Sequence, residues 1–103
     1  MDLKKVLKIA KITKKDPLFE AEVECIMRSI KRLDWNDFIH HLLEKRDRCR
    51  EIRNTQNAII LSMENEGITP PRLVIETKEL FNGYYNAYRD LIEEIRNETF
   101  SGN

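Results

Sequence analysis

Apolar residues recur every three or four positions along most of the chain, and this spacing predicts helices rather than strands. In residues 3–12 the apolar positions share one face and lysines surround the other, as in a short amphipathic helix. A second helix is predicted from Asp16, a typical capping residue, with Pro17 at the first helical position, where its missing N–H costs nothing. Its apolar stripe runs from Phe19 to Leu33. The first third of the chain is therefore expected to form two short helices.

A long helix is predicted from a cap at Asp34 or Asn36 to Gly67, which can supply a left-handed stop. Its stripe is interrupted at residues 53–57, where no apolar residue occurs. Three interpretations of this interruption are open: a helix that extends past shorter neighbours into solvent, a polar layer that fixes helix register, or a kink or break in the helix. The residues expected to share the apolar face are Trp35, Phe38, Ile39, Leu42, Leu43, Cys49, Ile52, Ile59, Ile60 and Met63.

The last helix is predicted to start at a Thr69 cap, with Pro70 and Pro71 in its first turn. Its apolar positions follow a repeat close to 3.5 residues, which is typical of a coiled-coil seam. These positions are Val74, Thr77, Phe81, Tyr84, Tyr85, Tyr88, Leu91, Ile92 and Ile95. Two helices of roughly thirty residues, each about 45 Å long, must run antiparallel when only a few residues join them.

The expected fold is all-α: a long antiparallel helical hairpin with one or two shorter N-terminal helices, which makes a three- to four-helix bundle. We expect a single domain over residues 1–103, in which residues 1–15 form a basic amphipathic helix or arm and residues 98–103 a frayed tail. Composition supports helices, because three glycines, three prolines and 35% charged residues leave little turn-forming sequence for a sheet.

The overall charge balance gives no preference for an anionic partner, since 18 basic and 18 acidic residues cancel. The exception is the stretch 1–15, which carries six lysines against one aspartate. Cys25 and Cys49 are too few for a disulfide framework and are interpreted as small buried hydrophobes. No stretch resembles a signal peptide or a membrane span. A cytoplasmic protein is expected.

Residue types that bind metals cluster only at His40, His41, Glu44 and Cys49. Adjacent helical residues point about 100° apart, so the two histidines diverge, and no second ligand pair completes a site. A glycine-rich phosphate loop, a nucleophile elbow and an isolated carboxylate pair are also missing from the sequence. We therefore predict no metal site, no cofactor and no enzymatic activity.

Aromatic residues crowd the last helix at Phe81, Tyr84, Tyr85 and Tyr88. Rings at helical spacing usually fill a bundle seam, but these four span an arc wider than one seam. At least one ring is expected to be exposed as an anchor for a protein partner. These four residues are the predicted partner-binding residues.

The basic N-terminal stretch offers a second candidate contact through Lys4, Lys8, Lys11 and Lys15. Lysines can bind the phosphates of nucleic acid or of a membrane surface. The stretch lacks aromatic residues for stacking and arginines for base recognition, and the rest of the chain is acidic. Nucleic acid is therefore a partner that the sequence allows without favouring.

Residues 30–52, IKRLDWNDFIHHLLEKRDRCREI, resemble a segment of FliT/FlgN-type flagellar (type III) export chaperones. Asp34-Trp35 stands where the family caps a helix, and Leu42-Leu43, Glu44 and Arg46 stand in the run that follows. The similarity covers about a fifth of the chain. It implies a small cytoplasmic helical hairpin that holds an export substrate.

The sequence thus favours a non-enzymatic helical protein-binding module, chaperone- or adaptor-like, that captures a partner through a helix groove. A small phage or mobile-element regulator that inhibits a host protein is equally compatible. A nucleic-acid-binding regulator that uses the basic N-terminal arm is the alternative from a different class. A homodimer is compatible with each of these interpretations.

Overall fold

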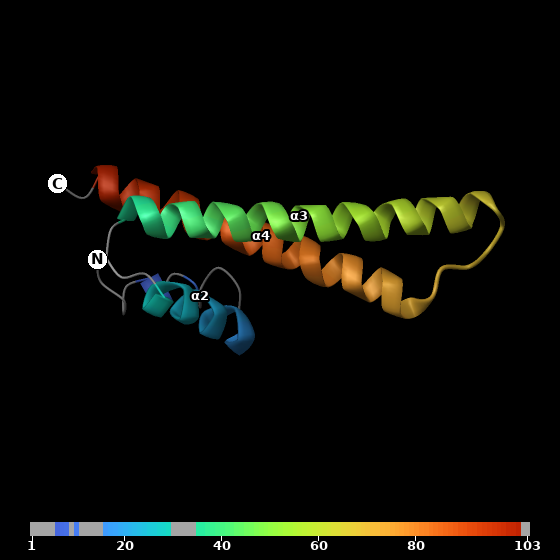
Figure 1. The fold of residues 1–103 in the computed structure, drawn as a ribbon, viewed down its shortest axis with the longest axis horizontal. Helices are drawn as coiled ribbons and strands as arrows, with labels where there is room; N and C mark the ends of the chain where they lie inside the picture. Colours follow the sequence, from blue (N-terminus) through green and yellow to red (C-terminus); the bar gives the residue numbers. More distant parts are fainter. Residues whose placement is uncertain (1–5, 9, 11–15, 30–34, 102–103) are drawn as a thin grey trace.

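The chain forms a long helical hairpin with a shorter helix packed against one end (Figure 1). The computed structural model describes residues 6–8, 10, 16–29 and 35–101. The three helices with defined bounds are α2 (Pro17–Ser29), α3 (Trp35–Asn65) and α4 (Arg72–Ser101). Residues 6–8 and 10 are also helical, and no described residue belongs to a strand. The prediction of an all-α hairpin with shorter N-terminal helices is confirmed.

Helix α2 starts as its capping sequence predicts. Asp16 Oδ1 accepts a hydrogen bond from the Leu18 N–H at 2.9 Å, and the Asp16 carbonyl accepts from the Phe19 N–H at 3.1 Å. Pro17 occupies the first helical position, where it has no N–H to satisfy. The predicted continuation to Leu33 and the cap at Asp34 lie outside the described residues.

Helix α3 is continuous from Trp35 to Asn65, so the polar stretch 53–57 contains no break. The helix stops at Gly67, which has a φ of 75°. The Ile68 N–H donates to the Met63 carbonyl at 2.8 Å and the Gly67 N–H to the Glu64 carbonyl at 3.0 Å, which is the hydrogen-bond pattern of a Schellman motif. The predicted left-handed stop is confirmed.

The start of α4 differs from the prediction. The Pro71 carbonyl accepts hydrogen bonds from the Val74 N–H at 3.1 Å and the Ile75 N–H at 3.4 Å. Pro71 therefore occupies the capping position that was predicted for Thr69, and Pro70 precedes the helix. At the other end, α4 continues as a helix to Ser101, whereas the sequence predicts a frayed tail from residue 98.

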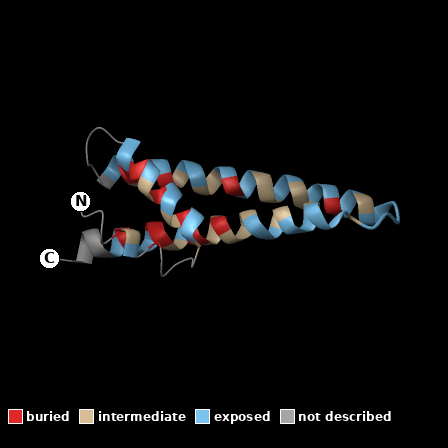
Figure 2. Ribbon diagram, turned by 90° about the horizontal axis from the view of Figure 1, so that it is seen from below, coloured by how far each residue is buried: buried red, intermediate tan, exposed pale blue. Residues whose placement is uncertain are grey.

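The hydrophobic core lies at one end of an elongated molecule of 56 × 25 × 22 Å. Figure 2 shows buried residues concentrated where α2 lies against the hairpin. Helix α2 contributes four buried residues, and α3 and α4 contribute the others together with Val6 and Ala10. The largest fully buried side chains there are Tyr88, Phe19, Phe38, Leu42, Leu91, Ile92, Ile95, Val6 and Val23.

The two cysteines differ in burial. Cys49 is buried in the core, as predicted, but Cys25 is exposed on α2, so its interpretation as a buried hydrophobe is wrong. Cys25 lies about 120° around the helix from Phe19, outside the apolar stripe that packs against the hairpin, so helical spacing already placed it off the buried side. No helix within the described residues is long and apolar enough to cross a membrane.

Candidate partner-binding surface

Two of the four predicted partner-binding rings hold α2 against α4. Tyr88 is fully buried and Tyr84 is 9% exposed. The Tyr88 hydroxyl donates to Glu22 Oε2 at 2.8 Å, and the Tyr84 hydroxyl donates to Asp16 Oδ2 at 3.1 Å. Phe19 packs edge-on against Tyr88, with ring centroids 4.8 Å apart. These two tyrosines therefore make an internal contact in this arrangement.

The hydroxyl protons of both tyrosines are held strongly. Burial, reinforced by the hydrogen bond to Asp16, raises the pKa of Tyr84 to about 12. Burial and the hydrogen bond to Glu22 raise the pKa of Tyr88 well above the ordinary value for tyrosine. Near neutral pH both hydroxyls are protonated and act as donors to the carboxylates of Asp16 and Glu22.

The other two predicted rings, Phe81 and Tyr85, are half-buried on α4. The Arg53 guanidinium covers the Tyr85 ring at 4.8 Å from its centroid. Arg53 Nη1 also donates to Asn82 Oδ1 at 3.0 Å. The polar stretch of α3 therefore contributes a link between α3 and α4, as the polar-layer interpretation expects. The stretch also lies past the end of α2, as expected for a helix that extends past a shorter neighbour.

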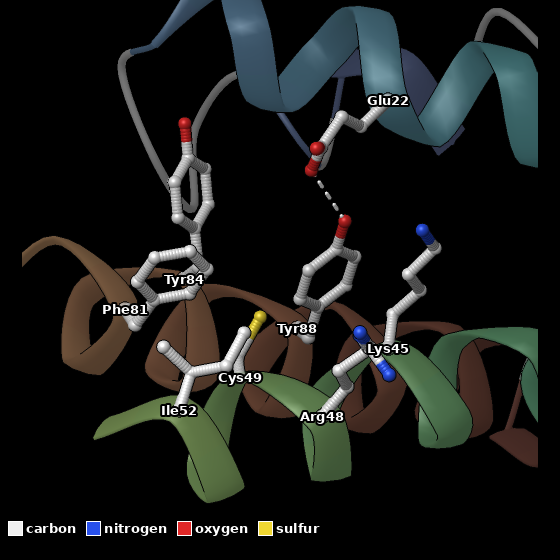
Figure 3. Close-up of a pocket in the computed structure, with 8 residues that line it drawn as sticks. All are labelled: Glu22, Lys45, Arg48, Cys49, Ile52, Phe81, Tyr84 and Tyr88. Carbon is white, nitrogen blue, oxygen red and sulfur yellow. Dashed lines mark hydrogen bonds between the residues drawn. The ribbon is translucent and has the colours of Figure 1, made fainter. Parts of the chain in front are cut away.

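A small cavity of about 180 Å³ lies where α2, α3 and α4 meet (Figure 3). Its walls combine the aromatic rings of α4 with Cys49 and Ile52 of α3, and its charged lining residues are Glu22, Lys45 and Arg48. Burial raises the pKa of the Cys49 thiol, and the nearby Glu22 carboxylate adds to this effect. A protonated thiol is a poor nucleophile, so Cys49 is not activated in this position.

The histidine cluster forms an exposed polar contact. His40 Nε2 lies 3.1 Å from Glu44 Oε1, and both side chains are mostly exposed. The two residues are four positions apart, a spacing at which side chains meet on a helix surface. Within the described residues, no group of three His, Cys, Asp or Glu side chains could hold a metal ion.

Large apolar side chains are exposed mainly on the half of the hairpin that α2 does not cover, which we call the distal half (residues 52–83). Among the described residues, six of the seven exposed large hydrophobic side chains lie there. They are Ile59 (40% exposed), Leu61 (52%), Ile68 (47%), Leu73 (73%), Ile75 (37%) and Leu80 (47%). Ile60 is the only buried residue among the described residues of the distal half.

Four residues of the distal half continue the side of the hairpin on which α2 packs. On α3, Ile52 and Ile59 follow Lys45 at seven-residue intervals, and Lys45 lies beside α2. On α4, Leu80 and Leu73 precede Tyr84 by four and eleven residues. Such intervals keep residues within about 40° of one another around a helix. We call Ile52, Ile59, Leu73 and Leu80 the open face.

Ile59, which the sequence places on the apolar face of α3, is exposed, whereas Ile60 on the same face is buried. The seam pattern continues along helices of 31 and 30 residues, but α2 has only 13 residues and covers less than half of that length. This difference in length is the sequence signal that could have located the open face.

Of the four lysines predicted as a basic contact, the structure describes only Lys8. Lys8 is exposed, whereas its helical neighbours Val6 and Ala10 are buried against the core. Lys4, Lys11 and Lys15 lie outside the described residues.

Comparison with family models, with curated proteins and with solved structures gives no match for this chain. The resemblance of residues 30–52 to flagellar export chaperones stays a prediction.

Proposed function

We propose that this protein is a non-enzymatic protein-binding module, adaptor- or chaperone-like, that captures an apolar helix of its partner on the open face. The observation that supports this proposal is the exposure of Leu73, Leu80 and Ile59 along one continuous side of two helices. Isolated apolar residues are common on protein surfaces, whereas an apolar strip along a groove is typical of a docking surface.

Helix α2 illustrates the kind of segment that this side of the hairpin accepts. It buries Phe19, Val23, Ile26 and Met27, which recur at intervals of four, three and one residue on one face of the helix. A partner helix with the same amphipathic spacing could lie end to end with α2 along the hairpin. Full burial of one leucine contributes about 1.5–3 kcal/mol, so Leu73 and Leu80 would act as the main anchors.

The compartment proposed for this interaction is the cytoplasm, because both cysteines are free thiols. An inhibitor of a host protein, of phage or mobile-element origin, would use the same surface in the same physical way. The resemblance to export chaperones would make the partner an exported protein.

The test compares two substitutions on one helix. Leu73 and Ile75 are both exposed, but two residues correspond to a turn of about 200°, so only Leu73 belongs to the open face. Tagged wild-type protein, Leu73→Asp and Ile75→Asp are used to capture partners from nuclease-treated lysate, and bound proteins are identified by mass spectrometry. We expect a protein retained by wild type and Ile75→Asp and lost by Leu73→Asp.

Two outcomes would contradict this proposal. Equal retention of the same protein by both variants would place the interface elsewhere. Loss of all bound material on nuclease treatment would instead favour the nucleic-acid alternative and the lysine-rich arm, and that binding should weaken steeply with added salt.

A further inference from the structure

We infer that a second copy of this chain occupies the open face, so that two distal halves pack antiparallel into a four-helix bundle. This inference rests on the proposed function, since both require the open face to accept helices. It adds the identity of one occupant and the geometry in which that occupant binds.

The first argument is the difference in layering along the hairpin. At the end that carries the core, α2 and the helical residues 6–8 and 10 add further layers over α3 and α4. Among the described residues, α3 and α4 are the only helices of the distal half, and two helices leave one side of each apolar stripe uncovered. A second hairpin laid across the open face gives the distal half four helices, which is the usual number for a closed bundle.

The second argument is that an antiparallel dimer accounts for exposed apolar residues at both ends of the open face. Leu18, at the start of α2, is 68% exposed where the open face begins, and Ile68, at the hairpin tip, is 47% exposed where it ends. In a two-fold symmetric, antiparallel pair, the tip of each copy reaches the start of α2 in the other. Leu18 of one copy then packs against Ile68 of its partner, twice in the dimer.

The third argument is charge. The α3 positions that point toward the open face are Ile52, Gln56, Ile59 and Met63, and on α4 they are Leu73, Thr77 and Leu80. All seven are uncharged. Glu76, four residues before Leu80, lies at the edge of this face and is paired with Arg72 at 2.6 Å, so two copies meet without an unpaired like charge. A partner that matches it must be equally free of charge along its contact, and each copy of the chain carries such a surface.

The available area suits a weak, reversible dimer. The strip spans about 20 Å along the helices and about 20 Å across two helix widths, so each copy would bury on the order of 500 Å². The total of about 1,000 Å² lies at the lower limit for specific interfaces, where weak and transient complexes are found, so we expect association in the micromolar range. A dimer of this strength covers the open face when no other partner is present and releases it by mass action when a tighter partner binds.

Sedimentation equilibrium of the full chain tests the inference. Between about 1 µM and about 500 µM protein, we expect the mass to rise from 12.3 kDa toward twice that value. Ile59→Asp and Leu73→Asp should weaken the dimer at least about 100-fold, because each substitution occurs twice in a symmetric interface. Leu61→Asp and Ile75→Asp are matched controls from the opposite sides of the same helices and should leave the association unchanged.

Disulfide cross-linking tests the antiparallel geometry. In a Cys25→Ser background, a mixture of Leu18→Cys and Ile68→Cys proteins should form a covalent heterodimer on mild oxidation. Neither protein alone should cross-link as efficiently. Efficient cross-linking of Ile68→Cys with itself would instead place the two tips together and overturn the antiparallel arrangement.

The outcomes separate this inference from the proposed function. A mass of 12.3 kDa at every concentration would refute the dimer. If Leu73→Asp failed to capture a protein that Ile75→Asp retained, the open face would bind other proteins but not a second copy of this chain. Equal dissociation by all four aspartate variants, with helical content unchanged by circular dichroism, would place the dimer interface elsewhere.

Discussion

Tyr88→Phe removes one hydroxyl group from the contact between α4 and α2 and leaves the ring in place. The hydroxyl donates to Glu22 Oε2 at 2.8 Å. The ring is fully buried and packs edge-on against Phe19. The substitution therefore separates the hydrogen bond from the packing of the ring.

The expected loss follows from the surroundings of the acceptor. A hydrogen bond to a charged group contributes about 1.5–3 kcal/mol to stability. Glu22 is exposed on α2, so its carboxylate regains water when the hydroxyl is lost. We therefore expect Tyr88→Phe to reduce the free energy of unfolding by about 1.5 kcal/mol, at the low end of this range. Tyr88→Ala also removes the ring and should cost about 3–5 kcal/mol.

Urea denaturation followed by circular dichroism measures these changes, and a double-mutant cycle assigns them to the pair. Tyr88→Phe combined with Glu22→Gln should show a coupling energy of about 1 kcal/mol. Tyr85→Phe is the matched control, because it removes a hydroxyl that has no hydrogen-bond partner among the described residues. Equal losses for Tyr88→Phe and Tyr85→Phe, with zero coupling to Glu22, would refute the reasoning.

Three further predictions concern alkaline stability, the core and the hairpin turn. The pKa of Tyr84 is raised in the folded protein above the unfolded value of about 10. Its contribution to stability is therefore complete below about pH 10 and is lost as the pH rises toward 12. Tyr84→Phe should reduce this loss of stability in denaturation curves measured from about pH 9 to 11. Leu42→Ala should destabilise the fold by about 3 kcal/mol, since Leu42 is fully buried, whereas Lys8→Ala should leave the urea midpoint unchanged. Gly67→Ala should cost about 1 kcal/mol in the same assay, because its φ of 75° strains an alanine although nothing lies within 4 Å of the added methyl group.

The elements of the fold that were predicted correctly depend on local signals. Asp16 caps α2 through atoms two and three residues away, and Gly67 ends α3 through its own backbone conformation. The lengths of α3 and α4 then require an antiparallel hairpin. Each of these features is decided within a few residues of chain, which is the range over which sequence patterns are informative.

The features that sequence did not predict depend on the position of α2. The hydrogen bonds of Tyr84 and Tyr88 join residues that are 68 and 66 positions apart. No periodicity within α4 indicates that these rings face carboxylates of α2, nor that Ile59 lies beyond the reach of that helix. The aromatic arc was therefore proposed as an interface, although α2 covers two of its four rings.

The placement of α2 also separates the buried core from the exposed open face along the same two helices. Where α2 covers the hairpin, the apolar stripe forms the core, and aspartate at Leu42 or Ile92 would unfold the protein because both side chains are buried. Past Leu18 the same stripe is exposed, and Leu73 can change without loss of core contacts because it is 73% exposed. The long helices thus let the buried end hold the open face in a fixed geometry. A docking surface built in this way needs no core of its own, because the register of α3 and α4 is already set by the covered end and by the link from Arg53 to Asn82.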